Sequence, residues 1–162
     1  MLAQLIIVLV SINLVYSKTC SYSNGTISAS WKYTNGAIQI NFQNSNLQNN
    51  QWTAIAFGQT MQNLSVIIFE NVNNQITVRT GVTRGYGPPT LDSSLQASPQ
   101  SMQLTGNNLR AVVNVPLTFN TNQVSSCQTW HFVVSGPITN GQIGHHTSLP
   151  LAVNNVCPLR CR

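Results

Sequence analysis

The chain has 162 residues, with 7 Lys and Arg against 2 Asp and Glu, and a hydrophobic fraction of 42%. Only 6% of the residues are charged, and 20 Asn and 14 Gln supply much of the polarity, whereas soluble domains usually carry about a quarter charged residues. This length suits one globular domain. The basic residues are spread along the chain, which argues against a nucleic-acid partner. Two acidic residues are too few for a calcium cage or a paired-carboxylate glycosidase site.

Residues 1–17 are predicted to be a secretory signal peptide. Leu5–Val10 is an apolar core too short to span a bilayer, and the residues before Lys18 suit signal-peptidase cleavage. We therefore expect residues 18–162 to form a single secreted, extracellular domain. Downstream of the signal peptide, no stretch of the sequence reaches membrane-spanning length.

Four cysteines lie in the mature part, which implies two disulfides in an oxidising compartment. A bridge between Cys157 and Cys161 would close a very small loop and constrain the unfolded chain least. Each of these two is therefore expected to pair with one of the distant cysteines, Cys20 and Cys127. The sequence does not decide which of the two distant cysteines each one pairs with. A zinc site built from these thiols and a histidine is the alternative, disfavoured because secreted thiols normally oxidise first.

The mature sequence alternates short extended segments with turn residues and has no helical apolar period. Ile27–Tyr33 alternates apolar and polar residues, and Asn35-Gly36 then predicts a hairpin into Ile38–Phe42. Apolar runs in the later candidates suggest either burial on both faces or a place at the centre of a sandwich. These candidates are Trp52–Phe57, Ser65–Phe69, Ile76–Arg79, Leu109–Val115 and Trp130–Val134. The pattern predicts an all-β fold, an antiparallel β-sandwich with an immunoglobulin-like two-sheet architecture.

The glycines are interpreted as turn residues. Gly136-Pro137 is expected to end the strand Trp130–Val134, and Gly81 and Gly85–Gly87 to lie in further turns. A phosphate-cradling loop would have to open a helix, and no helix is predicted. No G-x-S-x-G nucleophile elbow occurs in the sequence. We therefore expect neither a nucleotide cofactor nor a catalytic residue, and the protein is not predicted to be an enzyme.

A methionine and a histidine pair occupy connections that follow strands. Met61 comes after Trp52–Phe57, and His145-His146 comes after Trp130–Val134. Taken alone, such a methionine usually fills a gap in a core, and such a histidine pair is usually an exposed polar pair.

Several short motifs follow one another along the mature chain. They are W-T-A-I-A-F-G at 52–58 with Met61, Y-x-x-P-x-x-D at 86–92, C-x-x-W-H-F at 127–132, and I-x-x-H at 143–146 with Pro150. In order and spacing they resemble the DOMON domain, an extracellular β-sandwich module. The similarity extends over nearly the whole mature chain, and the chain is similar in particular to the small secreted single-domain members found in nematodes.

The resemblance implies a sandwich that either holds b-type haem between one Met and one His or binds another ligand such as a sugar. Met61 and His146 match the two haem-ligand positions. Two axial ligands leave the iron no open position, which suits electron transfer rather than oxygen activation. His145 is the competing ligand, and His131 is interpreted as a structural strand residue. Apart from haem iron, no metal is expected. Candidate partners for the haem propionates are Arg79, Arg84 and Arg110.

A haem-free extracellular module that binds carbohydrate or a protein is the alternative function. Trp and Tyr offer stacking surface, and the amides of Asn and Gln offer paired donors and acceptors. The sequence assigns no particular residues to this function.

Two N-glycosylation sequons are present, at Asn24 and Asn63. Side chains two residues apart in an extended segment point the same way. A glycan on Asn63 is therefore expected to crowd a haem bound at Met61.

Overall fold

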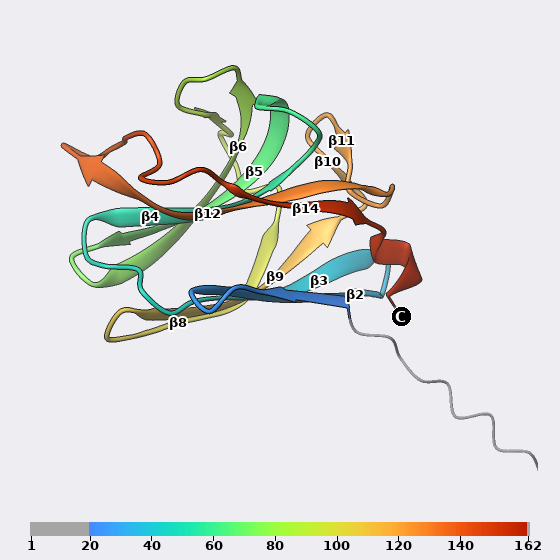
Figure 1. The fold of residues 1–162 in the computed structure, drawn as a ribbon, viewed down its shortest axis with the longest axis horizontal. Helices are drawn as coiled ribbons and strands as arrows, with labels where there is room; N and C mark the ends of the chain where they lie inside the picture. The colour runs from blue at the N-terminus through green and yellow to red at the C-terminus, as the bar shows by residue number, and fades with distance from the viewer. Residues whose placement is uncertain (1–19, 162) are drawn as a thin grey trace, which may run out of the picture.

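A computed structural model describes residues 20–161. The predicted signal peptide, residues 1–17, lies outside the described part. All strand pairings in this part are antiparallel, and the two large sheets that they form face each other (Figure 1). The predicted all-β antiparallel sandwich is therefore confirmed.

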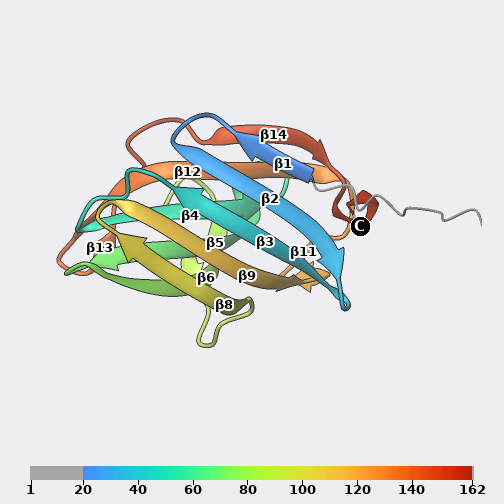
Figure 2. The same ribbon diagram turned by 90° about the horizontal axis from the view of Figure 1, so that it is seen from below.

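The first sheet has the strand order β1-β2-β3-β9-β8, and its five strands lie side by side in Figure 2. It consists of β1 (Cys20–Ser23), β2 (Ile27–Thr34), β3 (Ala37–Asn44), β9 (Asn108–Pro116) and β8 (Ser98–Thr105).

The second sheet has the order β13-β12-β4-β5-β6-β7, and β14 pairs with the edge of β12 that lies opposite β4. It consists of β13 (Gln142–Ile143), β12 (Gln128–Thr139), β4 (Gln51–Phe57), β5 (Gln62–Val72), β6 (Gln75–Arg84), β7 (Thr90–Leu91) and β14 (Leu151–Val156). A small ribbon of β10 (Thr118–Phe119) and β11 (Asn122–Gln123) and one 3-10 turn, η1 (Pro158–Arg160), complete the described part. Within residues 20–161, no helix is long and apolar enough to cross a membrane.

The core between the sheets is aromatic at its centre. Trp130 is fully buried, with its ring 4.8 Å from that of Trp31 and 4.9 Å from that of Phe57. Phe42 stacks on Phe69 across the two sheets at 5.2 Å. Such pairs hold the inner faces together through a large buried apolar area and favourable ring geometry.

Two central strands of the second sheet are buried on both faces, as their apolar runs predict. On β4 and β5, residues such as Ile55 and Ile67 face the core, while the alternate residues face outward. Together with Val133 of β12, the outward set forms a second apolar cluster, which consists of Trp52, Ala54, Ala56, Leu64, Val66, Ile68 and Val133. Leu109–Val115 meets the other expectation, a place at the centre of the sandwich: β9 alternates, its apolar residues pack in the core, and Arg110 is exposed.

Asparagine makes the tight turns of this protein. Asn35 (φ 50°) and Gly36 (φ 78°) close the predicted β2–β3 hairpin, and this prediction is confirmed. All eight non-glycine residues with positive φ in the described part are asparagines. Asn tolerates the left-handed conformation better than other side chains, which gives much of the Asn content a conformational role.

Two glycines predicted in turns lie inside strands. Gly136 is part of β12, whose turn comes later, at Asn140-Gly141. A Cβ on Gly136 would overlap the indole of Trp52. Gly81 lies in β6, where a Cβ would overlap the carbonyl oxygen of Thr90. Both glycines therefore serve close packing and not chain reversal.

The two expected disulfides are present. Cys20 pairs with Cys161 and Cys127 with Cys157, with Cα–Cα distances of 5.7 and 4.1 Å. Each C-terminal cysteine thus has a distant partner. All four sulfur atoms are used in these bonds, which removes the thiol ligands of the alternative zinc site.

Candidate functional site

A cavity of about 300 Å³ lies on the outer face of the second sheet, at the small end of the range typical of ligand sites, about 300–1,000 Å³. Its floor is the second apolar cluster, joined by His131. Ala54 and Ala56 stand between larger neighbours on this face, and their small side chains leave room above β4. The sequence T-A-I-A-F therefore packs the core with Ile and Phe and opens space on the other side.

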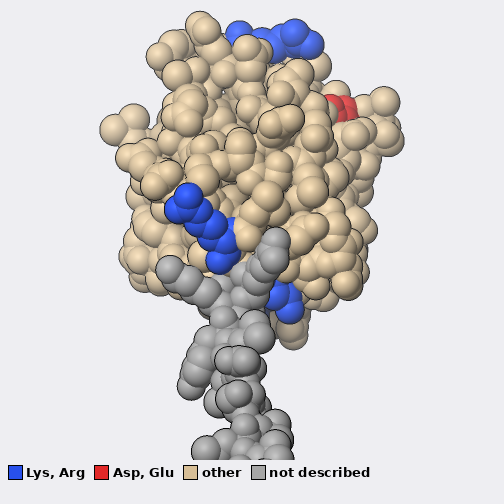
Figure 3. Space-filling view, turned by 90° about the vertical axis from the view of Figure 1, so that its right-hand side faces the viewer, with Lys and Arg blue, Asp and Glu red and all other residues tan. Residues whose placement is uncertain are grey.

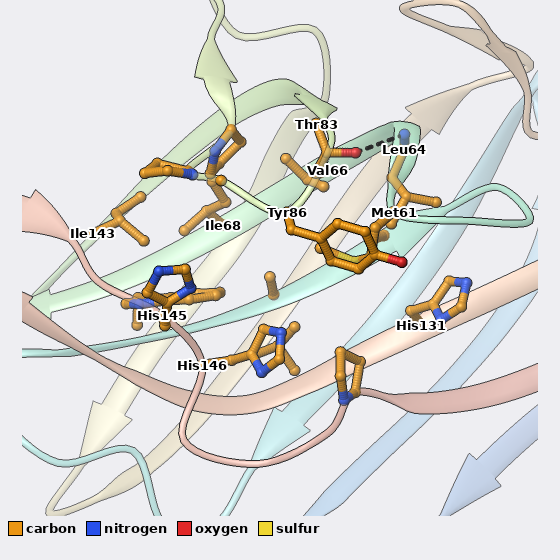
Figure 4. Close-up of a pocket in the computed structure, with 18 of the residues that line it drawn as sticks. Met61, Leu64, Val66, Ile68, Thr83, Tyr86, His131, Ile143, His145 and His146 are labelled. Atoms are coloured by element: carbon orange, nitrogen blue, oxygen red, sulfur yellow. Dashed lines mark hydrogen bonds between the residues drawn. The ribbon is translucent and has the colours of Figure 1, made fainter.

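Three connections form the walls of the cavity. The β4–β5 connection contributes Met61, the β6–β7 connection contributes Tyr86, Pro88 and Pro89, and the β13–β14 connection contributes Gly144 to His146 and Pro150. Figure 4 shows Met61, Tyr86 and the two histidines around the space above the sheet. Apart from the histidines and a few hydroxyl groups, the lining is apolar.

The structure brings Met61 and His146 to the same cavity, although 84 residues separate them in the sequence. Both side chains are half-buried. Figure 4 shows them on different sides of the space, coming from different connections. His145 also lines the cavity but is exposed, so His146 is the better enclosed of the two neighbours.

The Y-x-x-P-x-x-D motif has a structural explanation. The Asp92 carboxylate accepts hydrogen bonds from Thr80 Oγ1 at 2.7 Å and Asn120 Nδ2 at 3.3 Å, and the Asp92 N–H donates to the Thr80 carbonyl at 2.9 Å. These bonds anchor the chain directly after β7. Tyr86 and Pro89 lie in the β6–β7 connection before it and line the cavity wall.

His131 lies at the cavity floor, where its ring is half-buried. Burial lowers its pKa, and a hydrogen bond between Nε2 and the Gly58 carbonyl, 3.0 Å long, opposes this effect. Because a carbonyl can only accept, Nε2 carries the hydrogen. The neutral Nε2–H form is therefore the one that the surroundings favour.

Charged side chains have little part in the lining. Arg79 pairs with the buried Glu70 at 3.3 Å, and Arg110 lies on the first sheet. Arg84 is exposed at the end of β6, next to the wall connection. On the face drawn in Figure 3, Lys and Arg side chains are few and well separated. In the described ranges, no group of three or more His, Cys, Asp or Glu could hold a metal ion.

The expectation that Asn63 points the same way as Met61 is wrong. Asn63 has a φ of 61°, and the strand register shifts between Gln62 and Ser65, so the chain is not extended there. Asn63 is exposed and does not line the cavity, whereas Met61 does. A glycan on Asn63 is thus compatible with a ligand beside Met61.

The sequence motifs include several residues of the cavity walls, but they do not predict that the second apolar cluster forms the cavity floor. Trp52, Ala54, Val66 and Ile68 were expected only as strand residues. The available signal was the double-sided apolar run, since an outward apolar face needs a cover or a ligand.

The DOMON domain family model matches residues 23–136. A DOMON domain-containing protein of Caenorhabditis elegans is 37% identical over 151 residues, covering 90% of this chain and 89% of the relative. Another from Caenorhabditis briggsae is 34% identical over 168 residues, covering 99% of each. The resemblance seen in the sequence is confirmed. Neither relative's name states a reaction.

Two solved structures share the fold. The cytochrome domain of Myriococcum thermophilum cellobiose dehydrogenase has a TM-score of 0.64 at 9% identity, covering 88% of this chain and 83% of that domain. The cytochrome b domain of pyranose dehydrogenase from Coprinopsis cinerea has a TM-score of 0.60 at 13% identity, covering 78% and 74%. At these identities the likeness shows the fold alone.

Proposed function

Because the chain belongs to the DOMON domain family, we propose that its cavity binds a flat apolar ligand, with b-type haem held by Met61 and His146. One observation carries this proposal: a thioether and an imidazole from separate connections line one otherwise apolar cavity. The two cytochrome domains that share the fold support it. The sandwich would then be an extracellular electron-transfer module.

The donor set suits haem. Met sulfur and His nitrogen are a known axial pair, and iron held by both exchanges electrons without an open coordination position. In this chain the floor of Ala54, Ala56 and Val66 would exclude water from one side of the ligand. Met61 would present its sulfur and His146 an imidazole nitrogen. His145, which is exposed, is the natural comparison for His146.

We expect purified protein to bind haem in a 1:1 complex with a six-coordinate, low-spin visible spectrum. Met61→Leu keeps the side-chain volume but removes the sulfur, and His146→Gln removes the imidazole. Each is expected to weaken haem binding at least about tenfold, or about 1.4 kcal/mol. The measurement is a haem titration followed in the Soret region, with circular dichroism to verify folding.

His145→Gln is the matched control and is expected to bind like the unsubstituted protein. If the unsubstituted protein leaves the haem spectrum unchanged, or if Met61→Leu and His146→Gln bind as tightly as His145→Gln, the haem assignment fails.

Protein secreted by a eukaryotic host is the right material, because we also propose secretion and glycans on Asn24 and Asn63. Its intact mass before and after glycosidase treatment tests the glycans.

A second candidate function, carbohydrate binding, is favoured by the outer face of the first sheet. In Figure 2 no other element crosses this face. It carries a groove of about 690 Å³ that combines apolar surface with several serine hydroxyls, the amides of Asn41 and Gln43, and Arg110. Gln43 Nε2 donates to Asn108 Oδ1 at 3.1 Å and Asn41 Nδ2 to Ser30 Oγ at 3.3 Å. These bonds hold the amides in place, and amides match the paired donors and acceptors of sugar hydroxyls.

Titration with neutral oligosaccharides, for example chitohexaose and cellohexaose, tests this second candidate by calorimetry. Gln43→Ala is expected to weaken binding at least about fivefold, or about 1 kcal/mol. Gln39→Ala is the matched control, since Gln39 is an amide on the same strand that does not line the groove. Absence of binding to every oligosaccharide, or equal losses in the two variants, would reject carbohydrate binding at this face.

A further inference from the structure

His131 makes a contact that links the cavity floor to the connection carrying Met61. It belongs to β12, and its ring faces the cavity beside Val133, two residues further on the same face. Its Nε2 lies 3.0 Å from the carbonyl oxygen of Gly58, the first residue after β4. From Gly58 the chain continues through the exposed Gln59 and Thr60 to Met61.

Two more hydrogen bonds tie the start of this connection to β12. The Gly58 N–H donates to the Thr129 carbonyl at 3.1 Å, and Thr129 Oγ1 donates to Gln59 Oε1 at 3.2 Å. Gly58 itself has a φ of 136°, and an added Cβ would lie 2.8 Å from Leu64 Cδ2. The position therefore requires glycine. Glycine also makes the backbone easy to rotate, so external contacts must hold it.

We propose that His131 is a positioning residue, whose Nε2–H holds the Gly58 carbonyl and thereby keeps the Met61 thioether turned toward the cavity. The inference rests on the proposed function only for the role of Met61 as a ligand. The hydrogen bond between His131 and the Gly58 carbonyl, which we call the latch, is a property of the unliganded protein. With Nε2 engaged by Gly58, His131 is also withheld from binding a ligand through that nitrogen.

Burial supports this role. It lowers the pKa of His131, so the ring stays neutral at neutral pH, with hydrogen on Nε2 and a lone pair on Nδ1. A hydrogen bond from the half-buried His131 ring to the carbonyl of the buried Gly58 is more effective than an exposed one, because water competes less for both atoms. The strand that carries His131 is paired on both edges, by β4 and β14, which gives the latch a rigid base.

The first test uses the unsubstituted, unliganded protein. Nitrogen-15 NMR of the histidine rings is expected to show His131 as the Nε2–H tautomer, and hydrogen exchange is expected to show a protected Gly58 amide. An Nδ1–H tautomer would overturn the proposal whatever any variant does, because Nε2 could then not donate to a carbonyl.

The second test compares His131→Gln, which keeps a donor, with His131→Leu, which has none. In His131→Leu, Gly58 amide exchange is expected to rise at least about tenfold, and the Met61 methyl resonance to move toward its solvent-exposed value. In His131→Gln both changes are expected to be smaller. Ser135→Ala is the matched control, since Ser135 lies on the same strand but contacts Thr147 in the β13–β14 connection, which does not carry Met61. It is expected to leave Met61 unchanged.

Haem-loaded protein adds a readout that general destabilisation would not produce. The absorption band of methionine-ligated iron is expected to weaken in His131→Leu, and the reduction potential to fall as Met ligation is lost. If haem does not bind the unsubstituted protein but the NMR changes occur, the proposed function fails and the latch stands. If His131→Leu leaves Gly58 exchange and the Met61 resonance unchanged, the latch is wrong.

Discussion

The double substitution Cys20→Ser and Cys161→Ser is expected to lower the free energy of unfolding by about 5 kcal/mol in the chain-entropy account of disulfides. The bridge joins residues 141 positions apart, so its loss gives the unfolded chain a large gain in conformational freedom. The corresponding Cys127→Ser and Cys157→Ser substitution opens a closure of only 30 positions. Its expected cost is smaller, about 3.5 kcal/mol.

Urea unfolding of the three proteins under non-reducing conditions measures both values. The order of the two losses is the critical result. If the short closure costs as much as the long one, contacts of the bridges in the folded protein, rather than freedom of the unfolded chain, determine their stabilisation. Reducing the unsubstituted protein should give at least the larger of the two losses.

Trp130→Ala is expected to cost about 3–5 kcal/mol of stability. Its ring is fully buried between those of Trp31 and Phe57, so truncation leaves a cavity at the centre of the sandwich. Trp130→Phe should cost less, about 1–2 kcal/mol. Phenylalanine retains an aromatic ring, and the Trp130 Nε1–H that it removes has no hydrogen-bond partner within residues 20–161.

Chemical unfolding monitored by far-UV circular dichroism distinguishes the two variants. Tyr86→Ala is the control, since Tyr86 is 86% exposed and its substitution should change stability by less than about 0.5 kcal/mol. Equal losses for Trp130→Phe and Trp130→Ala would contradict this prediction, because they would mean that a retained aromatic ring restores none of the lost packing.

Strands with a periodic or continuous apolar pattern could be predicted from the sequence, and polar edge strands could not. The β2–β3 hairpin follows from alternation and one Asn-Gly pair. In contrast, β8 reads S-P-Q-S-M-Q-L-T, and six of its eight residues are exposed. What makes it a strand is backbone pairing with β9, which leaves no pattern in the side chains. β14 was missed for the same reason, because its pairing with β12 decides its conformation.

Local turn signals failed where distant packing decided the conformation. Gly136-Pro137 has the composition of a turn, yet the chain continues as a strand there because both residues pair with β4. Glycine is needed at this position because Trp52 occupies the space where a Cβ would stand. The site shows the same limit. Periodicity cannot bring Met61 and His146 together, since they lie on separate connections; only the resemblance to a family paired them. The left-handed conformation of Asn63 could not be predicted either, because the segment around it was expected to be extended.

The bridge that joins the two ends of the sandwich determines how the protein responds to mechanical tension. The Cα atoms of Cys20 and Cys161 are 5.7 Å apart and covalently linked through their side chains. A force applied at these two residues passes through the disulfide and does not load the hydrogen bonds between strands. An unbridged chain pulled in this way would unravel and lengthen by about 3.3–3.6 Å per residue. The oxidised module is instead a short, inextensible link, and reduction of one bond would convert it into an extensible one.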